Sequence, residues 1–139
     1  MPTKIFILVF KGDPVDLKKF RHTALYLEFA AGTHSMMHVT GTQGMFVFEA
    51  KTDYNPVLSR SLVKMIPAAE VPDSISEASI KSTVSATPAK NSREDLDWNC
   101  QLWVGDALTR LTDRDYVSKE QRDAAIDAMV DAYMEAEDE

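Results

Sequence analysis

The chain has 139 residues, of which 45% are hydrophobic and 27% are charged, as expected for a single globular domain with a buried core. Acidic residues outnumber basic ones by 22 to 15, and the net charge of −7 disfavours nucleic acids and anionic membrane surfaces as partners. A single cysteine excludes an internal disulfide and is compatible with a reducing compartment, so we expect a cytoplasmic protein.

The first half of the chain is typical of β-strands. Four strands are predicted, in residues 5–10, 22–29, 36–40 and 45–49. Turns or short connections are expected between them, at 12–14, 16–20, 30–33 and 41–44. The first strand is a continuous apolar run that is too short to cross a membrane and is followed by no small-residue cleavage site. We therefore expect it to be a buried strand.

The second half is predicted to be mainly helical. After a turn at 53–56 and an extended segment at 57–66, Pro67 and Pro72 are expected to bracket a linker. Helices are predicted at 74–86, from Cys100 onward and from Ser118 onward, the last with a capping box formed by Ser118 and Gln121. Its apolar stripe comprises Ile126, Met129, Val130 and Tyr133. The tail at 135–139 is acidic and is expected to fray.

Cys100, the only cysteine, stands where an amphipathic helix begins. Asp97 or Asn99 can cap this helix, so the thiol falls in its first turn. The unpaired amides and the helix dipole there favour a thiolate, and histidines elsewhere in the chain complete a pattern known from nucleophilic catalysis. The alternative is a buried structural cysteine, since free cysteines are among the most buried residues.

Three histidines are available as partners for the thiol: His22, His34 and His38. His22 opens a predicted strand, which is a rigid platform for a general base, and His38 could orient its imidazole. His34 falls in a turn and is expected to be solvated. The spacing of His34 and His38 would suit zinc only on a helix, and this segment is not predicted to be helical. We therefore predict no metal and no cofactor.

Two short motifs resemble the circularly permuted branch of the NlpC/P60 papain-like superfamily, and most closely the lecithin retinol acyltransferase family. They are HTALYL at residues 22–27 and NCQLWV at residues 99–104. The family places a histidine at the start of an H-x-A/G-φ-Y-φ strand, a second histidine on the neighbouring strand, and then the nucleophile in an N-C-x-x-F/W-V helix. This chain matches in order and in both motifs.

The resemblance implies an α+β fold: a single permuted papain-like domain over residues 1–139, with a small antiparallel sheet packed against helices. It also implies a thiol-dependent hydrolase or acyltransferase in which Cys100 is the nucleophile, His22 the base and His38 the orienting residue. Backbone amides at the helix start, including that of Cys100, would stabilise the oxyanion. Further residues within the motifs are expected to contact the substrate, namely Tyr26, Asn99, Gln101 and Trp103.

Two features depart from the family pattern. A hairpin centred on Ala30 would place His38 directly opposite His22, whereas the turn residues centre nearer Ala31 and Gly32, so that their pairing needs a bulge or an asymmetric loop. The family often carries a hydrophobic membrane anchor, which this chain lacks, so we expect a small-molecule or acyl substrate in solution. A cyclase or isomerase using the same cysteine, or a non-catalytic small-molecule binding protein of this fold, stays open.

Overall fold

The computed structural model describes residues 2–12, 21–41, 44–95 and 98–135. Within them the chain folds into one α+β domain, with an antiparallel sheet of five strands in the order β4-β3-β2-β1-β5. The strands are β1 (Thr3–Phe10), β2 (His22–Glu28), β3 (His34–Thr40), β4 (Val47–Thr52) and β5 (Leu62–Val71). The first four occur in the predicted order. The predicted connection at 16–20 and the end of the acidic tail lie outside the described residues.

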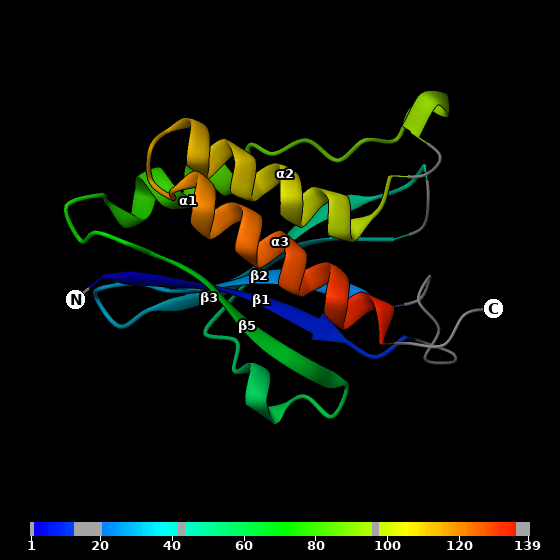
Figure 1. Cartoon of the computed structure of the whole chain (residues 1–139), viewed down its shortest axis with the longest axis horizontal. Coiled ribbons are helices and arrows are strands. Elements are labelled where there is room, and N and C mark those ends of the chain that lie inside the picture. Colours follow the sequence, from blue (N-terminus) through cyan, green and yellow to red (C-terminus); the bar gives the residue numbers. More distant parts are fainter. Residues whose placement is uncertain (1, 13–20, 42–43, 96–97, 136–139) are drawn as a thin grey trace.

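Three α-helices cover one face of the sheet (Figure 1). They are α1 (Glu77–Ser85), α2 (Cys100–Asp113) and α3 (Lys119–Met134), all in predicted segments. The segment that joins β4 to β5 lies on the opposite side of the sheet and contains the short 3-10 helix η2 (Pro56–Leu58); a second one, η3 (Arg93–Asp95), precedes α2. Among the described residues, no helix has the length and apolar character needed to cross a bilayer.

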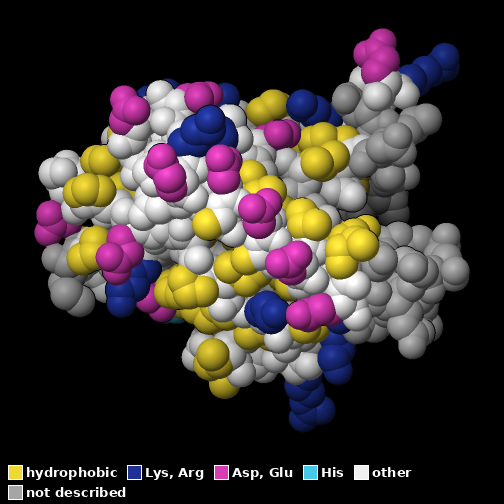
Figure 2. All heavy atoms as spheres, viewed as in Figure 1, with side chains coloured by type: hydrophobic (Ala, Val, Ile, Leu, Met, Phe, Trp, Pro, Cys, Tyr) yellow, Lys and Arg dark blue, Asp and Glu magenta, His cyan; other side chains and the backbone are white. Residues whose placement is uncertain are grey.

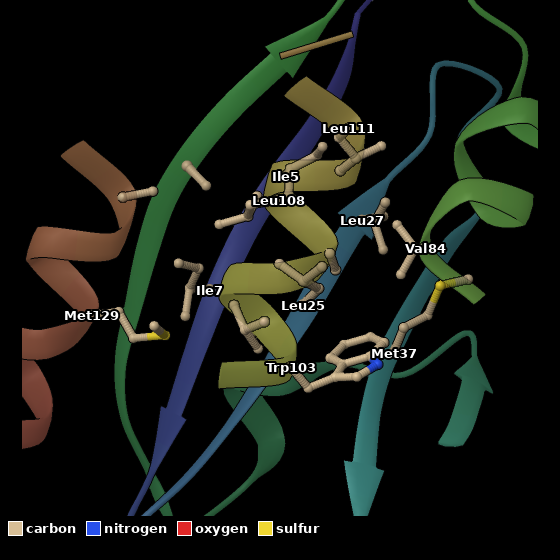
Figure 3. Close-up of a cluster of buried hydrophobic side chains, with 14 of the residues drawn as sticks. Ile5, Ile7, Leu25, Leu27, Met37, Val84, Trp103, Leu108, Leu111 and Met129 are labelled. Atoms are coloured by element: carbon tan, nitrogen blue, oxygen red, sulfur yellow. The ribbon is translucent and has the colours of Figure 1, made fainter. Parts of the chain in front are cut away.

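The main core lies between the sheet and the helices (Figure 3). Its labelled side chains come from β1, β2 and β3 and from all three helices: Ile5, Ile7, Leu25, Leu27, Met37, Val84, Trp103, Leu108, Leu111 and Met129. A smaller cluster occupies the other face of the sheet and contains Leu8, Phe10, Ala24, Tyr26 and Met36. Because β1 is covered on both faces, its apolar residues form a continuous run instead of alternating with polar ones.

Side-chain caps fix the starts of the two longest helices. Asn99 caps α2: its Oδ1 accepts hydrogen bonds from the backbone N–H groups of Gln101 and Leu102. The other predicted cap, Asp97, lies outside the described residues. Ser118 and Gln121 form the predicted capping box at the start of α3. The cap of α2 holds Cys100 as the first residue of that helix.

Two predictions about the second half are wrong. No linker lies between Pro67 and Pro72, because β5 runs through Pro67 to Val71. This proline is tolerated since β5 is an edge strand, and the β1–β5 register shifts beside it, between Ile5 and Phe6.

The predicted apolar stripe of α3 is wrong in part: Met129 is buried and Ile126 packs against the core as predicted, but the remaining buried residues differ. Ala125, Met129 and Ala132 are the buried residues, whereas Val130 is exposed. A stripe chosen for large side chains does not include the two buried alanines. Figure 2 shows the resulting helix-covered surface, where acidic and basic side chains are interspersed with small apolar patches.

Candidate functional site

Three side chains on neighbouring strands form a continuous set of hydrogen bonds, which we call the His–Glu relay. Nε2 of His22 lies 2.6 Å from Nδ1 of His38, and Nε2 of His38 lies 2.9 Å from Oε1 of Glu49. His22 is the first residue of β2, and Glu49 on β4 pairs directly with His38 on β3. The relay therefore contains His22, which was predicted to be the base, and His38, which was predicted to orient it.

The hairpin register explains how the two histidines meet. Leu25 pairs with Met37, and continuing this register by one residue places His38 opposite Ala24. His22 and His38 are thus diagonal neighbours on one face, close enough for two rings to touch. The β2–β3 pairs from Leu25–Met37 to Glu28–His34 contain no bulge, and the two rings meet beyond the last of these pairs.

Glu49 determines where the protons of the relay lie. An ionised carboxylate can only accept a hydrogen bond, so His38 donates to it from Nε2. A neutral imidazole carries one ring hydrogen, so Nδ1 of His38 is an acceptor, and His22 donates to it from Nε2. Nδ1 of His22 is then an unprotonated lone pair, as a general base requires.

Burial keeps both histidines neutral. Desolvation lowers the pKa of His22 to about 4; repulsion from His38 adds to this effect, and attraction to Glu49 opposes it. Desolvation also lowers the pKa of His38, against the hydrogen bond to Glu49. The hydrogen bond from His38 lowers the pKa of Glu49, and Lys51 lies 3.7 Å from the same carboxylate. At neutral pH the relay is a carboxylate followed by two neutral imidazoles.

Cys100 is half-buried at the first turn of α2, and its Sγ lies 4.0 Å from the carbonyl oxygen of Arg21. Burial raises the pKa of the thiol, while hydrogen bonds from the backbone and side chain of Thr23 and from the backbone of Cys100 and Gln101 lower it. The prediction that the helix start would favour the thiolate is therefore wrong for this conformation, because desolvation is the larger effect. The surrounding donors nevertheless form a site in which a thiolate would be hydrogen-bonded.

The structure does not join Cys100 to the relay. Cys100 packs against the main core on the helix side, where Thr23 also points. His22 leaves β2 on the other side and stacks on Phe10, with 5.9 Å between the ring centres. Among the described contacts no hydrogen bond joins Cys100 to His22, although the sulfur lies beside the backbone on either side of His22.

His34 and Tyr26 form a second polar cluster on the relay's face of the sheet. Nδ1 of His34 lies 2.7 Å from the carbonyl oxygen of Tyr54 and 3.2 Å from the hydroxyl of Tyr26. His34 was expected in a turn, yet it begins β3 because the strand starts two residues earlier than predicted. Both side chains line a cavity of about 380 Å³. Tyr26 thus lies beside His34, and no contact joins it to Cys100.

The predicted substrate contacts near Cys100 have other roles in this structure. Trp103 is fully buried, and its Nε1 donates to the carbonyl of Thr87 at 3.1 Å, so Trp103 is a core residue. Asn99 caps α2 as described, and Gln101 is half-buried next to the cysteine. Of the four residues predicted to contact substrate, Asn99 and Gln101 are half-buried and flank Cys100 in the chain, and the Asn99 side chain is engaged in capping α2.

Sequence reasoning missed three residues of the site. Glu49 could have been found by aligning the third and fourth strands, because it shares a face with His38 once they are paired. Thr23 was visible as the neighbour of His22, but its contact with the sulfur depends on the packing of α2. Arg21 donates from Nη1 to the carbonyl of Ala132 in the last turn of α3, at 2.6 Å, and no local signal indicates that contact.

The fold and the site together define an α+β domain that carries two histidines on adjacent strands and a cysteine at a helix start. The chain belongs to a family of unknown function (DUF6540), whose sequence model matches residues 14–118, a span that includes the relay and Cys100. Searches of curated proteins and of solved structures found no match. Within the described part of the chain, no three His, Cys, Asp or Glu side chains are placed to hold one metal ion.

Proposed function

We propose that the protein is a thiol-dependent enzyme, a hydrolase or acyltransferase acting on an amide, ester or thioester, with Cys100 as nucleophile and His22 as base. The observation that supports this most is the relay, which leaves the lone pair of His22 Nδ1 free. A second support is the position of the sulfur, against the backbone that flanks His22. The order of histidine strand, histidine strand and cysteine helix also supports a permuted papain-like core.

The proposed reaction proceeds through an acyl-enzyme. Nδ1 of His22 takes the thiol proton, and the sulfur forms a bond to the carbonyl carbon. The carbonyl oxygen becomes an oxyanion that accepts a hydrogen bond from the N–H of Cys100. His22 returns the proton to the leaving group as its bond to carbon breaks. Water or an amine then attacks the thioester and gives a proton to Nδ1 of His22, and His22 returns a proton to the sulfur as the carbon–sulfur bond breaks. The N–H of Gln101 already bonds to Asn99, so it is a weaker oxyanion donor.

The proposal requires Cys100 and His22 to reach the same carbonyl carbon. His22 is the first residue of β2, so a substrate at this end of the sheet can approach both side chains. The Cys100 thiol and the His22 ring leave the sheet on opposite sides, so the proposal also requires a movement that brings the sulfur around the Arg21 backbone at the start of β2. We propose a small-molecule or acyl substrate and action in the cytoplasm.

A non-catalytic small-molecule binding protein is the second candidate. It is favoured by the burial that raises the pKa of the Cys100 thiol and by the missing hydrogen bond to His22. In that case Cys100 is a packing residue, and the relay stabilises the sheet. A cyclase or isomerase would use the same thiol and base, so it depends on the same chemistry as the first proposal.

Thiol alkylation separates the two candidates. Wild type, His22→Ala and the control His34→Ala are treated with iodoacetamide at pH 7, and the modified fraction is followed by intact mass. If His22 assists ionisation, His22→Ala reacts about tenfold slower than wild type, corresponding to one pKa unit of the thiol. His34→Ala should match wild type. A wild-type rate no greater than that of free cysteine, unchanged in His22→Ala, would favour the binding protein.

A further inference from the structure

We propose that Glu49 is a positioning residue that fixes the ring hydrogens of both histidines and thereby keeps Nδ1 of His22 free. The consequence of this role for catalysis rests on the proposed function, whereas the effect of Glu49 on the histidine tautomers does not. The inference comes from the geometry of the relay, in which Glu49 occupies the outer end. Neither sequence motif includes this residue.

The exposure along the relay suits such a role. The Glu49 side chain is 46% exposed, whereas that of His38 is 6% exposed. The carboxylate therefore remains hydrated and charged while it receives a hydrogen bond from a buried ring, an arrangement that avoids the cost of burying a charge. Lys51, two residues along the same strand and on the same face, supports the ionised form.

Loss of the carboxylate would affect both rings because they share a hydrogen bond. Water at the outer end can donate as well as accept, so Nε2 of His38 would no longer be required to carry hydrogen. A His38 ring protonated at Nδ1 would donate to Nε2 of His22. The hydrogen of His22 would then lie on Nδ1, and the lone pair needed for the thiol would be lost. The exposed carboxylate of Glu49 thus determines whether Nδ1 of His22 carries a hydrogen.

The backbone of the sheet does not depend on this carboxylate. β3 and β4 pair over six residue pairs through main-chain bonds, from Ser35–Thr52 to Thr40–Val47. On the other side of His22, the ring of Phe10 can neither donate nor accept at the ring nitrogens. Among the described contacts of the two rings, Glu49 is therefore the one that selects a tautomer.

The test is imidazole nitrogen NMR on ¹⁵N-labelled full-length protein at pH 7.5, comparing wild type with Glu49→Ala and Glu49→Met. Wild type should show His22 and His38 with hydrogen on Nε2. A charge-assisted hydrogen bond favours one tautomer by roughly tenfold or more, so Glu49→Ala should raise the Nδ1–H form of His22 at least tenfold. His34 is an internal control, because its Nδ1–H donates to the Tyr54 carbonyl in every variant. Glu28→Gln, at the other end of β2, is the matched charge control.

Each outcome has one meaning. Unchanged tautomers in a folded Glu49→Ala overturn the inference. If that variant does not fold, the same spectrum of Glu49→Met, which keeps the side-chain length but has no carboxylate to accept from His38, decides the question. A shifted tautomer accompanied by slower alkylation of Cys100 supports both the inference and the proposed function. A shifted tautomer with unchanged alkylation supports the role of Glu49 but counts against His22 as the base for Cys100.

Discussion

Replacing Thr23 by valine should stabilise the fold while making Cys100 less reactive. Thr23 is fully buried, and its hydroxyl has no hydrogen-bond partner while Cys100 is a thiol. The same hydroxyl lowers the pKa of Cys100, because it can donate to the sulfur once the thiol ionises. We infer that the hydroxyl costs stability in the resting protein and is useful only when the thiolate forms.

The size of the effect follows from the missing partner. A buried polar group without a hydrogen bond costs about 1–3 kcal/mol, and valine has nearly the same shape as threonine and favours strands. We therefore expect Thr23→Val to raise the free energy of unfolding by about 1 kcal/mol. Ser35→Ala is the matched control: Ser35 Oγ is also buried and unpartnered, but it lies on β3 opposite Leu27, away from the cysteine.

Urea unfolding and iodoacetamide alkylation measure the two effects separately. Both variants should unfold at higher urea than wild type, with unchanged dependence on urea. Only Thr23→Val should also slow the alkylation of Cys100, since Ser35 does not contact the thiol. A loss of stability in Thr23→Val would refute the reasoning, because it would mean that the hydroxyl is bonded in the folded protein. Equal alkylation rates in wild type, Thr23→Val and Ser35→Ala would refute the role of the Thr23 hydroxyl at the thiolate.

Two further predictions concern stability. Since folding lowers the pKa of His22 from 6.5 to about 4, the stability due to its neutral form is fully present above pH 6.5 and is lost as pH falls toward 4, by at most about 3 kcal/mol. The urea midpoint of wild type should fall across this pH range, and that of His22→Gln should fall less. If the two midpoints fall equally with pH, the lowered pKa of His22 is not the cause. Leu108→Ala should cost about 2–5 kcal/mol because Leu108 is fully buried, whereas Leu102→Ala, on the exposed side of the same helix, should change stability by no more than about 0.5 kcal/mol. Similar losses in the two variants would show that α2 does not pack as described.

The elements predicted best were those with strong local signals. The apolar run of β1, the cap of α2 by Asn99 and the capping box at Ser118 each depend on neighbouring residues, and each is present. β5 was predicted less well because prolines ordinarily end strands. Pro67 is compatible with a strand only at the edge of a sheet, and the order of strands is a tertiary property that no short segment encodes.

The hairpin shows how a small error in register changes a site. A hairpin centred on Ala30 would set His38 directly opposite His22, whereas the observed register, continued by one residue beyond Leu25–Met37, sets it opposite Ala24. The turn residues indicate this offset, and a bulge or an asymmetric loop was predicted to correct it. Diagonal contact between aromatic rings makes a bulge unnecessary, and the same register brings His34 opposite Glu28, far from the relay.

The faces of the sheet explain why the cysteine and the relay are separated. Alternation correctly places His22, Ala24 and Tyr26 on one face of β2, but within this strand both faces contain large apolar residues, so β2 by itself does not show which face the helices cover. The choice becomes clear only when the paired strands are taken together. One face collects the aliphatic residues of the main core, and the other collects the histidines, Tyr26, Glu49 and Lys51. An amphipathic helix buries its apolar side against the more apolar face. The polar residues that make the relay therefore direct α2, with Cys100 at its start, to the other side of the sheet, and any reaction that joins them must take place at the end where β2 begins.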